Sequence, residues 1–213
     1  MQAENLKWPA LIAQFLAYAV CALSVVSALS LGVWMLLYMQ MAESPVLLGI
    51  SSLAVLLRNV LFLISALAVI IWVYMAHANM HRAKLEGLNF SSAWAAFSFL
   101  VPIANLWFPY AAMRELANRS AGEPPEFAGS EVSAVSSWWS SWVGTMVVGV
   151  IIAYTIAVAL VPGLFMTTPF MATQAILVLG NVLLAAAAYF LARVISAVTA
   201  DQRQGFNMAS VFE

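Results

Sequence analysis

Residues 90–113 read FSSAWAAFSFLVPIANLWFPYAAM, a stretch long and apolar enough to cross a lipid bilayer. Pro102 and Pro109 interrupt it. Each proline removes a backbone hydrogen-bond donor and clashes with the preceding helical turn, so a straight membrane-spanning helix is disfavoured here. Because broken backbone at membrane depth is tolerated only where protein or a cavity satisfies it, this stretch is predicted to be a re-entrant or interfacial helical segment.

The rest of the chain is apolar enough for a polytopic membrane protein. Of its 213 residues, 64% are hydrophobic and 8% charged, whereas soluble domains carry about 25% charged residues. This composition excludes the water-soluble class. We expect an all-α integral membrane protein with four transmembrane helices in a single domain over residues 1–213, with spans at about 11–39, 59–76, 138–160 and 172–194 and a polar loop over 114–135.

The distribution of basic residues predicts the orientation of these spans. With four spans and a broken fifth segment, seven of the eight Lys and Arg residues face one side, and only Arg58 faces the other. A full fifth span would carry Arg114 and Arg119 to the opposite side. Since short cytoplasmic loops retain Lys and Arg, both termini are predicted to be cytoplasmic. The basic residues on the cytoplasmic side would be Lys7, Arg82, Lys84, Arg114, Arg119, Arg193 and Arg203.

Charge and cysteine content exclude some partners and covalent features. The net charge is −1 and the sequence pI is about 6.1. A nucleic-acid partner is therefore not expected, because neutralising phosphates requires a basic face. Cys21 is the single cysteine, so the chain forms no intrachain disulfide. The lipid bilayer is the expected partner, with a membrane-protein partner or a homo-oligomer as further possibilities.

Two histidines suggest a metal or haem site. His77 and His81 are four residues apart near the end of the second span, so both rings would lie on one helix face. Glu86 is a candidate third ligand. The alternative is that water and lipid headgroups satisfy both rings at the membrane exit. Nothing else in the sequence requires a cofactor.

The sequence contains no enzyme motif. It has no paired carboxylates within a span, no Gly-x-Ser-x-Gly turn, no zinc-protease motif and no phosphate-binding loop. A non-enzymatic protein is therefore expected.

Several polar and aromatic residues fit either a structural or a functional role. Gln14, Arg58 and Asn181 fall in apolar stretches. Buried amides beside small residues hold membrane helices together, but they also line pores. Arg58 either lies at the outer interface or belongs to a solute pathway. The tryptophans at 138, 139 and 142 either form an interfacial belt or provide a stacking surface for a planar ligand or lipid.

The polar and aromatic residues around the broken segment resemble a known family pattern. The matching residues are Trp72, Tyr74, Ala76, His77, Asn79 and Gly87, the string VPIANLWFPY at 101–110, Met113-Arg114-Glu115, and Trp138-Trp139-x-x-Trp142. Over about 57–194 the chain resembles the bacterial family called domain of unknown function 4328. That family usually has an arginine where this chain has Met75.

The resemblance implies a small protein of the bacterial inner membrane, without an established activity. It also implies that the residues of its pattern meet in space, namely His77, Asn79, Asn105, Trp107, Arg114, Trp138, Trp139 and Trp142. The leading hypothesis is a non-enzymatic protein with a cytoplasmic-side site for a protein partner or lipid. The alternatives are a channel or small-solute transporter formed by an oligomer and, less favoured, metal or haem binding at His77 and His81.

Overall fold

The computed structural model describes residues 5–37, 45–124, 130–161 and 169–209, and every regular element among them is helical. The elements in chain order are α1 (Lys7–Leu36), α3 (Pro45–Arg82), α4 (Ser92–Phe97), the short 3-10 helix η1 (Ala104–Leu106), α5 (Phe108–Ser120), α6 (Ser130–Ala159) and α7 (Phe170–Ala209).

Four of these helices are long and apolar enough to cross a membrane. Their candidate spans are Lys7–Leu36, Ser52–Arg82, Ser133–Ala159 and Met171–Gln204. The predicted all-α class with four spans is confirmed. The helices are longer than the predicted spans, and residues 46–57 belong to α3.

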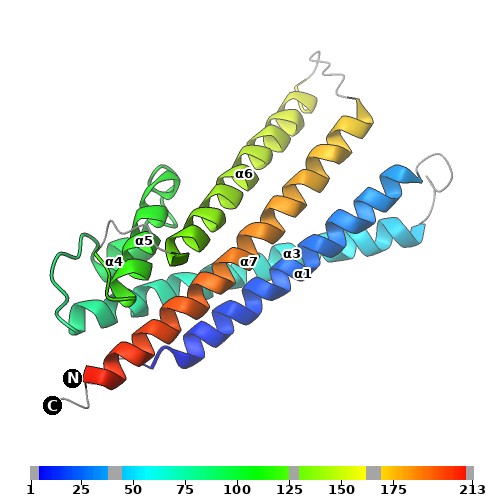
Figure 1. Ribbon diagram of the computed structural model, residues 1–213. Helices are drawn as coiled ribbons and strands as arrows, with labels where there is room; N and C mark the ends of the chain where they lie inside the picture. Colours follow the sequence, from blue (N-terminus) through cyan, green and yellow to red (C-terminus); the bar gives the residue numbers. More distant parts are fainter. Residues whose placement is uncertain (1–4, 38–44, 125–129, 162–168, 210–213) are drawn as a thin grey trace.

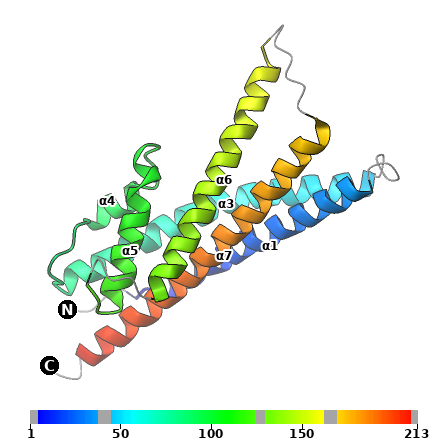
Figure 2. The ribbon, with the colours of Figure 1, turned by 45° about the horizontal axis from the view of Figure 1, so that its top comes forward.

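The long helices form a splayed bundle (Figures 1 and 2). α1 packs against both α3 and α7, and α6 packs against α7. α3 and α6 diverge toward the end of the bundle that is remote from α4 and α5. The start of α1, the ends of α3 and α7, and the α4–α5 segment all lie at the other end (Figure 1), which we call the α5 end.

The outward faces of the bundle are apolar. Leu63 on α3 is 65% exposed and Val150 on α6 is 69% exposed. Moving such a side chain from water into an apolar environment is favourable by about 1.5–3 kcal/mol. These faces are therefore more stable in contact with lipid hydrocarbon than in contact with water. The largest buried side chains gather instead at the α5 end, where Trp72, Met80, Met113, Leu116 and Ile195 are fully enclosed.

The predicted break in residues 90–113 is confirmed. α4 begins at an N-cap, where the Ser91 hydroxyl accepts a hydrogen bond from the Trp94 backbone N–H at 3.2 Å, and it ends at Phe97. Pro102 lies in the following turn. Pro109 lies in the first turn of α5, where its missing N–H breaks no helical hydrogen bond.

The predicted polar loop over 114–135 is wrong at both ends. Residues 114–120 continue α5, because the buried Leu116 and Ala117 give this stretch an apolar side and most of its residues are good helix formers. α5 ends in a Schellman motif: Gly122 has φ +81°, and the N–H of Glu123 donates to the Asn118 carbonyl at 2.9 Å. α6 has already begun at Ser130.

The end of α3 also has a residue in the left-handed conformation. α3 ends at Arg82, and Lys84 adopts φ +53°. The N–H of Lys84 donates to the His81 carbonyl at 3.0 Å, and that of Leu85 donates to the Met80 carbonyl at 3.3 Å, which is the same motif built on a non-glycine residue.

Candidate ligand cavity

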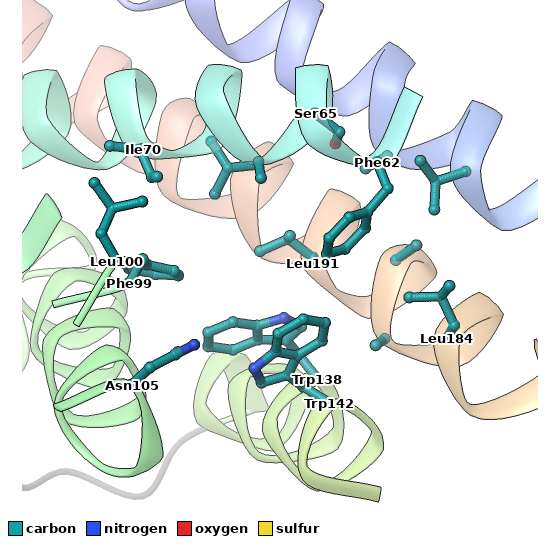
Figure 3. Close-up of a pocket in the computed structure, with 16 residues that line it drawn as sticks. Phe62, Ser65, Ile70, Phe99, Leu100, Asn105, Trp138, Trp142, Leu184 and Leu191 are labelled. Carbon is teal, nitrogen blue, oxygen red and sulfur yellow. The ribbon is translucent and has the colours of Figure 1, made fainter. Parts of the chain in front are cut away.

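A cavity of about 270 Å³ lies in the angle between α3 and α6, with α7 and α1 behind it. Figure 3 shows its walls. Nearly all of its walls are hydrocarbon. The lining residues are Ala17, Val20, Phe62, Ser65, Ala66, Val69, Ile70, Phe99, Leu100, Asn105, Trp138, Trp142, Leu184, Ala187, Ala188 and Leu191.

Stacked aromatic pairs hold the cavity open. Trp138 and Trp142 are four residues apart on α6, so their indoles share a face. Phe62 of α3 stacks on Trp142 with ring centroids 5.9 Å apart, and Phe99 stacks on Trp138 at 6.2 Å. α3 and the turn after α4 are thereby joined to α6 by rings rather than by close backbone contact.

The broken segment supplies one wall and a polar group. The Asn105 N–H donates to the Val101 carbonyl at 2.7 Å, which tightens the turn around Pro102. The Asn105 side chain then points into the cavity toward Trp138 (Figure 3). Its amide makes no side-chain hydrogen bond within the described part of the chain, so it is available to a ligand.

A second group of predicted residues is buried at the α5 end, apart from the cavity lining. His77 is fully buried, and its Nδ1 lies 3.0 Å from the Val73 carbonyl oxygen. Because a carbonyl only accepts, Nδ1 carries the proton. Asn79 is buried one turn away, and its side-chain oxygen lies 3.5 Å from Arg82. These contacts stabilise the end of α3.

The two histidines occupy different environments. His81 is exposed, and its Nε2 donates to the Phe90 carbonyl at 2.8 Å. Among the residues that the structure describes, no three His, Cys, Asp or Glu side chains form a cluster suited to a metal ion. Glu86, the candidate third ligand, is exposed, and its backbone carbonyl accepts from Arg119 at 2.6 Å.

The residues of the family pattern, which were expected to meet in space, therefore do not form a single site. Asn105, Trp138 and Trp142 line the cavity. Trp139 stacks on Tyr110 at 6.1 Å, beside the cavity rather than in its lining. Of the remaining four predicted residues, His77 and Asn79 lie on the buried end of α3, Arg114 is half-buried on α5, and Trp107 is exposed.

Trp107 is the predicted residue that the fold turns outward. Its side chain is 65% exposed, and it does not line the cavity. At the end of η1 it stands beside other exposed apolar side chains such as Ile103 and Leu106.

The polar residues of the spans are largely engaged with one another. The Arg58 guanidinium donates to Asn181 on α7 and to its neighbour Asn59. Asn181 in turn donates to the Leu177 carbonyl at 2.7 Å. Gln14 is half-buried on α1 and lies outside the cavity lining.

Several polar or aromatic residues in the cavity and at the α5 end were not among the candidate site residues from the sequence. Phe62 and Phe99 complete the cavity. Glu115, Thr199 and Gln202 are buried and bond to other segments of the chain. Spacing offered one signal, since Glu115 and Gln202 each fall on the apolar side of an amphipathic helix. No sequence signal marks Phe99, because its contact with Trp138 depends on the tertiary fold.

Comparison with known proteins identifies a family without a described activity. A family model described as "Domain of unknown function (DUF4328)" matches residues 37–200. No curated protein and no solved structure matches the chain. The match covers the broken segment, α3, α6 and most of α7, which are the elements that supply most of the cavity walls.

Proposed function

Since the chain belongs to the DUF4328 family, whose description assigns no activity, we propose from its own cavity that it is a non-enzymatic membrane protein that holds a lipid acyl chain between α3, α6 and α7. The cavity is the single observation that carries this proposal.

Size and chemistry favour a hydrocarbon chain as the ligand. An apolar cavity of about 150 Å³ is large enough to take up benzene. The present cavity is about 270 Å³ and is walled by aliphatic and aromatic side chains. The most abundant apolar molecule around an integral membrane protein is a lipid tail, and a flexible chain fits an elongated space between diverging helices.

The polar end of the cavity supports a bound ligand rather than an inert void. Asn105 presents an amide to otherwise apolar walls. Ligand pockets commonly combine apolar walls with a few polar groups that fix orientation.

We place the protein in the bacterial inner membrane with the α5 end in the cytoplasm. Lys7, Arg82 and Arg203 belong to the helix ends that gather there, Lys84 follows α3, and Arg114 and Arg119 belong to α5. This asymmetry is the one that orients short-looped membrane proteins. A fluorescent protein fused to the C-terminus should fluoresce, and an alkaline phosphatase fused there should be inactive; the reverse pattern would refute the orientation.

The alternatives of a channel and an enzyme receive less support from the geometry. Arg58 and Asn181, polar residues within the candidate spans, bond to each other rather than facing an open path. The buried carboxylate of Glu115 accepts hydrogen bonds from the backbone N–H groups of Asn89 and Phe90, which gives it a structural role.

Filling the cavity tests the proposal. Ala66 lines it, whereas the adjacent Leu67 is 60% exposed on the outer face. Purified A66F should retain less lipid than the wild type in native mass spectrometry, and L67F, a ring added outside the cavity, should retain as much as the wild type. Equal retention by A66F and the wild type would refute acyl-chain binding in the cavity.

A crosslinking experiment needs no variant. A phospholipid with a photoreactive diazirine in its acyl chain should label wild-type peptides that contain Phe99, Trp138 or Trp142. Labelling confined to outward residues such as Leu63 and Leu67 would show that lipid only coats the outside, and would refute the proposal.

A further inference from the structure

Arg58 carries a positive charge inside the candidate span Ser52–Arg82, and its hydrogen bonds to described residues all go to neutral amides. Nε and one terminal nitrogen donate to the Asn59 side-chain oxygen at 3.3 and 3.0 Å. The other terminal nitrogen donates to Asn181. No carboxylate in the described segments pairs with it.

The asparagine amides accept hydrogen bonds from the Arg58 guanidinium, but they do not neutralise its positive charge. A guanidinium has five N–H groups, and these three hydrogen bonds leave two of them. A charged side chain within a span is costly and marks a functional site by default. The group best suited to an arginine with spare N–H donors is an oxyanion such as phosphate, which accepts two parallel hydrogen bonds.

The position of Arg58 relative to the cavity indicates what would carry that phosphate. Arg58 and Phe62 are four residues apart on α3, so they share a face and are separated by about 6 Å along the axis. On α7, Asn181 precedes Leu184 by three residues. Phe62 and Leu184 both line the cavity. The Arg58–Asn181 pair therefore stands one helical turn beyond the cavity wall.

The pair is also fixed in place. Asn181 is 6% exposed and its amide is held by the Leu177 carbonyl. Gly180, next to it, lets α6 approach so closely that an added Cβ would lie 2.8 Å from Val148 Cγ1. The amide partner of Arg58 is thus positioned before any ligand arrives.

We propose that the cavity binds an anionic phospholipid, with its phosphate on Arg58 and one acyl chain in the space between Phe62 and Trp138. This rests on the proposed function and adds the headgroup class to it. Arg58 selects the headgroup, and the apolar walls hold the chain.

The test compares two lipids with identical chains. Purified full-length protein is incubated with phosphatidylglycerol or with a diacylglycerol, which has no phosphate, and retained lipid is measured by native mass spectrometry. The wild type should retain phosphatidylglycerol about tenfold better, the ratio expected from one charge-assisted contact of about 1.4 kcal/mol. Equal retention of both lipids would overturn the headgroup assignment and leave chain binding intact. Retention of neither would overturn the proposed function itself.

Variants locate the selectivity. R58Q should retain the diacylglycerol as the wild type does and lose the preference for phosphatidylglycerol. R193Q, which removes an exposed cation from α7, should keep the preference. An unchanged preference in R58Q would refute the role of Arg58. If R58Q does not fold, R58K can replace it, because lysine keeps the charge but not the planar guanidinium. R58K should prefer phosphatidylglycerol by a factor between one and ten.

A soluble anion separates the two possible sources of phosphate. Inorganic phosphate, added at the concentration of the lipid, should not displace bound phosphatidylglycerol, because it gains nothing from the apolar walls. Displacement by phosphate alone would show a free-anion site and overturn the phospholipid assignment.

Discussion

Trp72 on α3 donates its indole N–H to the hydroxyl of Thr199 on α7 at 3.1 Å, although the two residues are 127 positions apart in the sequence. Trp72 is fully buried and Thr199 is 7% exposed. The bond lies between the cavity and the α5 end of the bundle. It fixes the spacing of α3 and α7, which both line the cavity.

Replacing Thr199 by valine removes this bond while keeping the side-chain volume. The indole N–H is then buried without an acceptor, which costs about 1–2 kcal/mol. We expect T199V to lower the thermal unfolding temperature in detergent by several degrees. In a W72F background the same substitution should have little effect, because the donor is already gone. An equal loss in both backgrounds would show that the hydrogen bond is not the cause.

Glu115 on α5 fixes the connection that follows α3. Its two carboxylate oxygens accept from the backbone N–H groups of Asn89 at 2.7 Å and Phe90 at 3.2 Å. Glutamine has only one such acceptor, so E115Q leaves one N–H facing an NH₂ group. We expect a loss of about 1–3 kcal/mol in unfolding free energy and faster hydrogen exchange at residues 89 and 90. E86Q, a change at an exposed carboxylate, is the matched control and should change neither.

Gln202 on α7 docks α5 onto the bundle. Its amide nitrogen donates to the Ala76 carbonyl at 3.1 Å and to the Ser120 hydroxyl at 3.0 Å, so one side chain joins α3, α5 and α7. Q202L should therefore loosen the end of α5 and speed trypsin cleavage after Arg119. Q204L, the same substitution at an exposed position of the same helix, should be cleaved at the wild-type rate. If Q202L is cleaved no faster, α5 is held without this contact.

Local signals in the sequence predicted the break around Pro102 and Pro109, because a proline acts on its own turn. They did not predict the continuation of α5 to Ser120. Arg114, Glu115 and Arg119 were interpreted as loop residues, yet the buried Leu116 between them belongs to an amphipathic helix. In a chain dominated by fully apolar helices, a half-polar helix is easily mistaken for a loop.

The cavity and its charged neighbour could not be predicted, because each depends on contacts between distant segments. Asn105 and the tryptophans were candidates from the sequence, and the structure places three of them in one lining. Phe62 and Phe99, which stack on those tryptophans, carry no local mark of that role. The Arg58–Asn181 contact joins residues 123 positions apart.

Gly180 offers the sharpest test of how α6 and α7 pack. A methyl group there would lie 2.8 Å from Val148 Cγ1, which sits on a β-branched side chain with little freedom to turn away. Gly149, also within a long apolar helix, would place a new Cβ with no atom within 4 Å. Alanine favours a helix over glycine by about 0.5–1 kcal/mol. G149A should therefore raise the unfolding temperature slightly or leave it unchanged, whereas G180A should lower it.

The same pair of variants links packing to ligand binding. Separating α6 from α7 at Gly180 also displaces the adjacent Asn181, so G180A should lose part of its preference for phosphatidylglycerol, while G149A keeps it. Lipid retention and unfolding temperature, measured on both variants, test whether the packing at Gly180 contributes to headgroup selectivity. If G180A is destabilised but equally selective, Arg58 recognises the headgroup without the help of its amide partner.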